Sequence, residues 1–163
     1  MNNFTLKSLL VLLFVFHPSI TSQTANNYLS IESEKQLVEK AIHNCIGWAK
    51  NKDINLLYSV IANDTSFLEV HPNDKVVKGF EDFKKAEKFW MSQDFKAVRY
   101  EIKDLKINFS KSGGVAWFFC MLDDINEWKG QPANWENTRW TGVLEKIDGS
   151  WRIVQQHFSF ASK

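Results

Sequence analysis

The sequence predicts an α+β domain in which helices pack against one face of a strongly bent antiparallel sheet. The first half of the chain contains three stretches with apolar residues at helical spacing. The second half contains four runs rich in β-branched and aromatic residues. The last two of these runs flank Asp148-Gly149, which is the strongest short-range signal for a hairpin. Helices grouped ahead of a meander of strands are typical of the α+β class.

The predicted helices cover residues 33–50, 53–61 and 80–92. Ser33 and Gln36 suit a capping box at the start of the first helix. Asp53 is expected to cap the second helix, because its side chain can accept a bond from a free backbone N–H. A short strand over 66–70 separates the second helix from the third.

Three long strands follow over 97–109, 114–122 and the first arm of the hairpin, and the second arm is the fourth. The stretch 123–137 between them is polar and contains Pro132, with Trp128 and Trp135 embedded in it. We expect it to be a loop, and a loop of that length inside a compact domain is more often functional than accidental.

The hairpin can form in two registers. A type I turn closed by a bulge at Gly149 would place the odd-numbered residues of both arms on one face, with Arg139 near His157. A tighter two-residue loop would turn the side chains of one arm to the opposite face. Both faces carry large apolar groups, so we expect the hairpin to be buried on both sides.

Residues 1–22 are predicted to be a secretory signal. Lys7 gives a modest positive start, the apolar run from Leu9 to Phe16 follows, and Pro18 ends it. The run is too short for a permanent membrane span, and an uncleaved anchor is the alternative. The mature protein is therefore expected to be secreted or periplasmic, with no membrane contact after cleavage.

Composition excludes some classes of partner. The formal net charge is +1 and no Lys/Arg cluster stands out, so nucleic acid is not an expected partner. Aromatic residues make up 14% of the chain, a set suited to filling a core or lining a cavity. Cys45 and Cys120 lie in apolar patterns and are interpreted as buried thiols. A disulfide between them is the alternative that export would permit.

Several stretches carry a resemblance to a known family. They are Gly79-Phe80-Glu81-Asp82-Phe83, Gly114-Val115-Ala116-Trp117 and the closing run from Asp148 to Ser159. They resemble the SnoaL-like branch of the nuclear transport factor 2 superfamily, over about residues 33–161. The Glu69 strand and His157 with Ser159 are also similar to the association domain of calcium/calmodulin-dependent kinase II. The resemblance implies a cone, in which a curved antiparallel sheet wraps around a long helix and leaves a pocket at the open end.

The same resemblance implies a set of residues that contact a ligand. It places the odd-numbered residues of the strand that begins at Gly114 toward the pocket, from Trp117 to Asp123, with the hairpin opposite. The expected ligand contacts are Trp90, Trp117, Phe119, Met121, Trp140, Gln156 and Phe158. Gly142 among these large neighbours would leave room for a cavity, whereas the alternative is that the aromatic rings simply fill the cone. The kinase hub has arginines at the positions of Met121, Gly142 and Phe158, so capture of an acidic ligand is not inherited.

Candidate acid–base residues are Asp123, His157 and Tyr58. Asp123 would be the carboxylate base, with Tyr58 or Trp140 as donors to an oxyanion. The competing interpretation of Asp123-Asp124 is a solvated strand end. His157 with Arg139 could be a general base or an anion site, or a buried cluster that fixes sheet register. Glu69 could cap or pair locally, and His71 is interpreted as a surface residue.

Relatives of this family include isomerases, cyclases, dehydratases and non-catalytic hubs, so the fold does not fix the function. We expect a homodimer that binds a small, largely apolar ligand, and a cofactor-free isomerase, cyclase or lyase activity on that ligand is left open. No cofactor or metal is expected, because no ligand constellation or phosphate loop is visible. The alternative is a non-catalytic interaction module that grips a partner through residues 124–138.

Overall fold

The computed structural model describes residues 20–161. The chain divides into two units, Met1–Glu32 and Ser33–Lys163. Residues 1–19 of the predicted signal lie outside the described part. Within that part, no helix is both long and apolar enough to cross a membrane.

The helices come first in the chain, as predicted, but their bounds differ. Helix α1 spans Ile20–Gly47, so it does not begin at Ser33. A single 3-10 turn, Trp48–Lys50, leads to α2 (Ile54–Val60). The Asp53 side chain accepts from the Leu56 N–H at 3.1 Å, which confirms the predicted cap. The predicted third helix is two short helices, α3 (Phe80–Lys84) and α4 (Glu87–Trp90).

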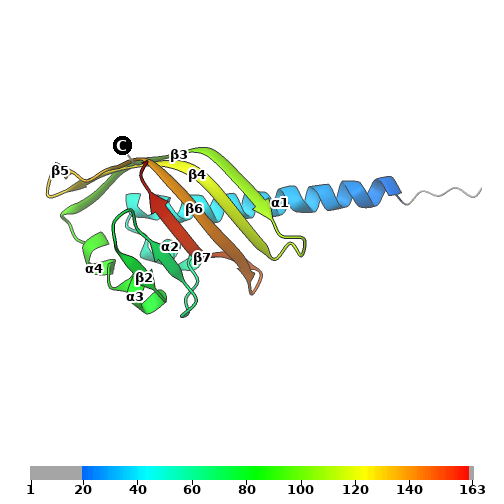
Figure 1. The fold of residues 1–163 in the computed structure, drawn as a ribbon, viewed down its shortest axis with the longest axis horizontal. Coiled ribbons are helices and arrows are strands. Elements are labelled where there is room, and N and C mark those ends of the chain that lie inside the picture. Colours follow the sequence, from blue (N-terminus) through cyan, green and yellow to red (C-terminus); the bar gives the residue numbers. More distant parts are fainter. Residues whose placement is uncertain (1–19, 162–163) are drawn as a thin grey trace, which may run out of the picture. The chain divides into compact units, whose positions relative to one another are not determined.

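One seven-stranded sheet makes up the rest of this unit. Its strands are β1 (Leu68–Val70), β2 (Val76–Lys78), β3 (Phe95–Phe109), β4 (Val115–Trp128), β5 (Gln131–Pro132), β6 (Trp135–Ile147) and β7 (Ser150–Ser159). The order is β2-β1-β7-β6-β4-β3, with β5 paired to β4. The β1–β7 pair is parallel, so the sheet is mixed rather than purely antiparallel. Figure 1 shows the long strands curling over α2, α3 and α4.

The predicted loop over 123–137 is wrong. Strand β4 continues to Trp128, the chain reverses at Lys129 and Gly130, both with positive φ, and β6 begins at Trp135. The polar residues of this stretch belong to the far end of β4 and the start of β6, and those of β4 are buried or half-buried. Polarity therefore did not indicate a loop.

The hairpin combines the two registers considered above. Asp148 and Gly149 have φ of 50° and 80°, which is a tight two-residue turn with Ile147 opposite Ser150. Leu144 pairs with Ile153, but Val143 pairs with Gln155, so Val154 is an extra residue in β7. This β-bulge reverses the alternation of side chains. Trp151 and Ile153 are buried before it, and Gln156 and Phe158 are buried after it.

The core fills the concave side of the sheet. Val38, Ile42 and Cys45 of α1 belong to one buried cluster that also includes inward residues of β4, β6 and β7. On β4 the buried residues are the even-numbered ones, Ala116, Phe118, Cys120 and Leu122. Both cysteines are buried and free, which agrees with the interpretation as thiols rather than a disulfide.

Candidate functional site

A cavity of about 530 Å³ lies on the concave side of the sheet. Its walls come from the end of α1, the 83–95 segment, the β1 strand and the far ends of β4, β6 and β7. This volume lies within the range of small-molecule sites, which are mostly apolar with a few placed polar groups. At the cavity, β1, β4 and β7 carry the polar residues Glu69, Asp124, Asn126 and Gln156 in place of aliphatic core residues.

Aromatic side chains form most of the wall. They are Trp48, Phe83, Phe89, Trp90, Phe95, Trp135 and Phe158. Many are fixed by contact with one another. The Phe83 and Trp90 rings lie 5.0 Å apart, and the Trp135 and Phe158 rings lie 5.3 Å apart in an edge-on arrangement. Such pairs favour defined ring orientations, so the apolar wall is already shaped before a ligand enters.

The first polar cluster is held by β1 and β7, whose parallel pairing places Glu69 opposite Gln156. The Gln156 Nε2 donates to Glu69 Oε2 at 2.7 Å, and its Oε1 accepts from Trp140 Nε1 at 3.3 Å. The Cys45 thiol donates to the same Oε1 at 3.6 Å. These contacts fix which way the Gln156 amide points, and they thereby hold the Glu69 carboxylate in place. Glu69 and Gln156 are 5% and 2% exposed.

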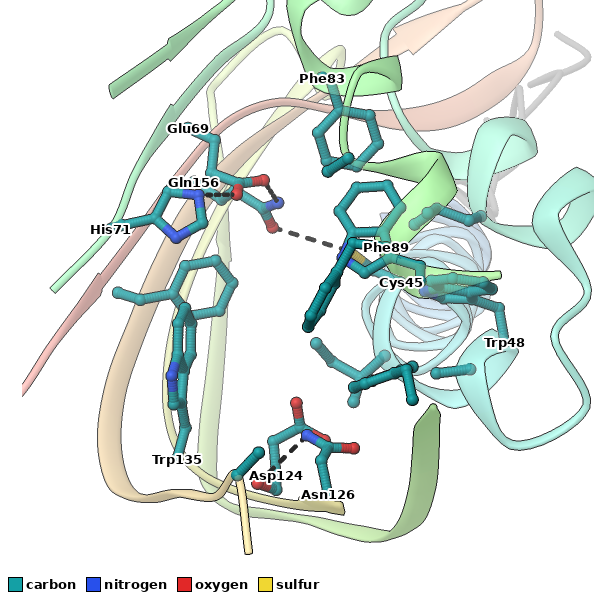
Figure 2. A pocket seen from close by; sticks show the side chains of 18 of the residues that line it. Cys45, Trp48, Glu69, His71, Phe83, Phe89, Asp124, Asn126, Trp135 and Gln156 are labelled. Carbon is teal, nitrogen blue, oxygen red and sulfur yellow. Dashed lines mark hydrogen bonds and ion pairs between the residues drawn. The ribbon is translucent and has the colours of Figure 1, made fainter. Parts of the chain in front are cut away.

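His71 stands beside this carboxylate (Figure 2). Its Nε2 lies 2.5 Å from Glu69 Oε1, in contact but not aligned as a hydrogen bond. Because a carboxylate only accepts, we assign the ring proton to Nε2, which leaves Nδ1 as the acceptor. The ring meets Trp135 edge-on at 5.8 Å, which limits its rotation. A histidine in this setting is suited to accept a proton from a bound molecule.

The second polar cluster is Asp124 with Asn126, both on β4. Figure 2 shows the two side chains together, apart from the Glu69–His71 pair. Burial raises the pKa of the Asp124 carboxyl, an effect that a hydrogen bond from Asn126 partly offsets. Asn126 is 7% exposed, and its Oδ1 has no hydrogen-bond partner among the described residues. The wall of the cavity therefore holds a carboxyl with a raised pKa next to a buried amide.

Three residues predicted to contact a ligand line this cavity: Trp90, Gln156 and Phe158. Trp140 lies behind the wall instead, fully buried and stacked on Phe158 with ring centres 5.4 Å apart. Gly142 does not open space either. A Cβ there would lie 2.6 Å from the Phe118 ring and 2.8 Å from the Gln155 carbonyl oxygen, so its room is already filled.

The inward orientation predicted for Trp117, Phe119 and Met121 is wrong. Trp117 and Phe119 are 46% and 37% exposed, and the even-numbered residues of β4 face the core. Both faces of this strand are apolar, so alternation alone could not distinguish them. None of the three lines the cavity.

The predicted catalytic residues also lie elsewhere. Asp123 faces outward, where it accepts from Lys103 Nζ at 2.6 Å and from the Asn137 N–H at 2.7 Å; both bonds lower its pKa. The Tyr58 hydroxyl donates to Glu87 at 2.6 Å, and burial together with that carboxylate raises the pKa of the phenol. His157 pairs with Thr141, and Arg139 pairs with Ser159. None of Asp123, Tyr58 or His157 lines the cavity.

Sequence reasoning missed His71, Asp124, Asn126 and Trp135. One signal was available, because Phe67, Glu69 and His71 alternate in an extended run. The buried Phe67 places that face inward, and Glu69 and His71 follow it. Asp124 and Asn126 likewise continue the even-numbered face of β4. Within residues 20–161, no three or more His, Cys, Asp or Glu side chains lie close enough together to hold a metal ion.

Solved structures with the same fold come from several bacteria. A nuclear transport factor 2-like superfamily protein from Salmonella enterica is 21% identical, with a TM-score of 0.65 over 81% of this chain and 94% of that one. A protein from the same family in Streptomyces avermitilis, a proposed dehydratase, is 15% identical with a TM-score of 0.69, over 81% and 99%. One with a cystatin-like fold from Novosphingobium aromaticivorans is 12% identical with a TM-score of 0.66, over 90% and 93%.

At these identities the likeness shows the fold alone. No curated protein matches the chain. The sequence profile of the SnoaL-like domain, however, matches residues 38–163, which include the whole sheet and every cavity residue named above. The chain therefore belongs to the SnoaL-like domain family, within the nuclear transport factor 2-like fold.

Proposed function

We propose that the cavity binds a small, largely apolar molecule and transfers a proton on it without a cofactor. The observation that carries the proposal is the pairing of two unlike polar clusters in one aromatic cavity. His71 backed by Glu69 is a base, and Asp124 is a carboxyl whose pKa is raised by burial. An imidazole held by a carboxylate and a carboxyl held in an apolar wall are groups that can supply a base and an acid to one site.

The chemistry follows from the two clusters. His71 Nδ1 takes a proton from a carbon next to a carbonyl, and the Glu69 carboxylate stabilises the imidazolium that forms. The protonated Asp124 donates a hydrogen bond to the oxygen on which negative charge develops. Such a donor acts most strongly in a site from which water is excluded. Proton removal of this kind is a step shared by isomerases, cyclases and lyases, and the proposed dehydratase from Streptomyces avermitilis has the same fold.

Binding can be tested by native mass spectrometry of the purified chain, and by titration with β-tetralone as a flat ketone probe. Trp135→Ala removes a wall of the cavity and is expected to weaken binding of the probe at least about tenfold. Trp117→Ala is the matched control, because this tryptophan lies on the outer face. Equal binding by both variants, or no binding by the parent chain, would count against a ligand cavity.

Proton transfer can be tested by NMR, as exchange of the acidic CH protons of β-tetralone for deuterium. We expect the parent chain to accelerate exchange over buffer, and His71→Gln to lose about a hundredfold of that acceleration. Asp124→Asn is expected to lose less, because an amide can still donate a hydrogen bond. His157→Gln is the control outside the cavity. If β-tetralone binds but its exchange is not accelerated, the cavity binds a ligand without catalysing proton transfer.

A second proposal is a homodimer through the outer face of the sheet. Trp117 and Phe119 lie two residues apart on the outer face of β4, and both are exposed. A single exposed apolar residue is ordinary, but neighbouring large ones indicate a surface that contacts another protein. Sedimentation of the parent chain and of the Trp117→Lys, Phe119→Lys double variant tests it. Dissociation of a dimer by the double variant supports the proposal, and an unchanged sedimentation coefficient contradicts it.

Export is proposed from the sequence of residues 1–22. N-terminal sequencing of the chain recovered from the periplasm or medium tests it. A mature chain that begins near residue 23 is the expected result, and retention of Met1 in the cytoplasm would overturn it.

A further inference from the structure

Trp140 lies outside the cavity, but its indole N–H bonds one of the cavity's polar groups. The side chain is fully buried, and its Nε1 donates to Gln156 Oε1 at 3.3 Å. The ring is fixed by edge-on contact with Phe118, at 4.9 Å between ring centres, and by stacking on Phe158 at 5.4 Å. The Cys45 thiol donates to the same amide oxygen at 3.6 Å. Two donors held by the core therefore meet one end of the Gln156 amide.

These donors decide which way the amide points. An indole N–H can only donate, so the Gln156 atom that faces Trp140 must be the oxygen. The NH2 end then faces Glu69, where Nε2 donates to Oε2 at 2.7 Å. A reversed amide would place donor against donor at Trp140 and an oxygen against the Glu69 carboxylate. Gln156 and Glu69 are only 2% and 5% exposed, so little water is available to relieve such a mismatch.

The orientation of the amide matters for His71 because the Glu69 carboxylate contacts both side chains (Figure 2). One carboxylate oxygen accepts from Gln156, and the other lies 2.5 Å from His71 Nε2. A donor at the first oxygen stabilises negative charge on the carboxylate. A negative carboxylate beside Nε2 favours the tautomer whose proton is on that nitrogen. The same tautomer leaves Nδ1 without a proton, as the proposed reaction requires.

A second buried indole shows what the same kind of bond does away from the cavity. Trp151 is 5% exposed, and its Nε1 donates to Glu34 Oε2 at 2.7 Å. Neither of these two residues lines the cavity. This bond ties β7 to α1, so its loss should affect stability alone. The Trp140 bond differs because it leads, through Gln156, to a carboxylate that contacts the proposed base.

We propose that Trp140 is a positioning residue: through Gln156 and Glu69, its N–H keeps the ring proton of His71 on Nε2. The inference rests on the function proposed above and adds to it a residue that acts on the base from outside the cavity. Trp140→Phe is the informative variant, because it removes the N–H and keeps an aromatic ring that can stack on Phe158.

Deuterium exchange into β-tetralone tests the effect on catalysis. Trp140→Phe is expected to lose about two- to tenfold of the acceleration, as the loss of one hydrogen bond predicts, with the dissociation constant of β-tetralone kept within about twofold. Trp151→Phe is the matched control and should change neither quantity. An equal loss of acceleration in both variants, or weaker binding in Trp140→Phe with unchanged exchange of the bound probe, would overturn the inference.

A double-mutant cycle tests whether Trp140 acts through Glu69. Glu69→Gln removes the negative charge, so the addition of Trp140→Phe to this variant should cause no further loss of exchange. Two losses that multiply would show that Trp140 acts by another route, which would also overturn the inference.

Nitrogen NMR of the His71 side chain tests the inference without any ligand. Above about pH 8, where an imidazole is ordinarily neutral, the parent chain and Trp151→Phe should show mainly the Nε2–H tautomer. Trp140→Phe should show a larger share of the Nδ1–H tautomer. A parent chain with the proton on Nδ1, or the same tautomer in all three chains, would contradict the inference.

The parent measurement decides even if Trp140→Phe does not fold. It also separates this inference from the proposed function. A parent chain that has the expected tautomer but does not accelerate exchange would contradict the proposed proton transfer, and the tautomers of the variants would still decide whether Trp140 orients His71.

Discussion

The two faces of β4 have similar sequences and opposite environments. Phe118 on the inner face is 2% exposed, whereas its neighbour Phe119 on the outer face is 37% exposed. Both faces carry large apolar groups, so composition does not say which one is the core. The environment of each face is decided by what packs on it: α1 and the cavity lie on the inner side, whereas Trp117 and Phe119 of the outer side remain exposed.

The same difference sets the chemistry of two adjacent carboxyl groups. Asp123 on the outer face is ion-paired with Lys103, and its pKa is lowered by that hydrogen bond and by the Asn137 N–H. Asp124 on the inner face borders the cavity, and burial raises its pKa. A carboxyl in a polar setting stays ionised and a buried one tends to keep its proton. Of the two, the inner residue is therefore the better proton donor, because it keeps its proton to a higher pH.

The largest expected difference between the faces is in stability. Phe118→Ala is expected to lower the free energy of unfolding by about 3–5 kcal/mol, because it leaves a cavity in the core. Phe119→Ala should lower it by about 1 kcal/mol or less, since the ring is partly solvated already. Urea unfolding of both variants measures this. Equal losses would mean that the outer face is covered in solution, as a dimer would require.

A smaller effect is expected at Gly142, which faces the Phe118 ring. Gly142→Ala should destabilise by about 1–3 kcal/mol, because its Cβ would overlap the ring and the Gln155 carbonyl oxygen. Gly114→Ala is the control, since the nearest side-chain atom to a Cβ there is Ser112 Oγ at 3.8 Å. Combining Gly142→Ala with Phe118→Leu should recover part of the loss in a double-mutant cycle. Strict additivity would show that the two sites do not touch.

The two carboxyl groups should respond to pH with opposite signs. The raised pKa of Asp124 means that the folded state binds its proton more tightly than the unfolded chain, so stability falls as pH rises above the ordinary Asp value. Asp124→Asn should therefore be more stable than the parent at neutral pH, with the gain lost in acid. The lowered pKa of Asp123 acts in reverse, because its contribution is present above the ordinary value and lost as pH falls.

Thermal unfolding of Asp124→Asn and Asp123→Asn between pH 3 and 7, the range in which carboxyl groups ordinarily titrate, measures both effects. Asp123→Asn should be less stable than the parent at neutral pH, and the two curves should converge in acid. Its effect should be slight, since the ion pair lies near the surface and is screened by solvent. A loss of stability at neutral pH in Asp124→Asn would contradict the assignment of Asp124 as a buried acid.

The smallest effect concerns the thiols, both of which belong to the inner side. Burial raises the pKa of Cys120 to about 12 and raises that of Cys45 as well. Neither should react with a disulfide reagent in the folded chain at mildly alkaline pH, because the thiolate is the reactive form. Both should react once the chain is unfolded in guanidinium. Rapid modification of Cys45, the thiol that lines the cavity, would mean that the cavity opens to solvent.

The fold was predictable because its signals are local. The Asp148-Gly149 turn, the Asp53 cap and the apolar spacing of the helices each depend on a few neighbouring residues. The family resemblance then supplied the curled sheet, which the described strands confirm. The parallel pairing of β1 with β7 joins residues that are far apart in sequence, and no local pattern indicated it.

The candidate site was less predictable because it depends on which way each strand faces. Trp90, Gln156 and Phe158 were placed in the cavity, but Trp117, Phe119 and Asp123 were assigned to the wrong face of β4. An apolar strand gives no alternation from which to choose. The Glu69 and His71 pair was visible only through Phe67, whose burial the sequence alone does not show.

The bulge at Val154 has a consequence for how such sites diverge. Without it, regular alternation from Ile153 would turn Gln155 and His157 inward and Gln156 and Phe158 outward. The bulge thus lets β7 carry the extra residue Val154 and still present an amide and a phenyl ring to the cavity, whereas a regular strand of the same sequence would present an amide and an imidazole. A shift of the bulge along β7 would therefore change which side chains the cavity receives, without any substitution.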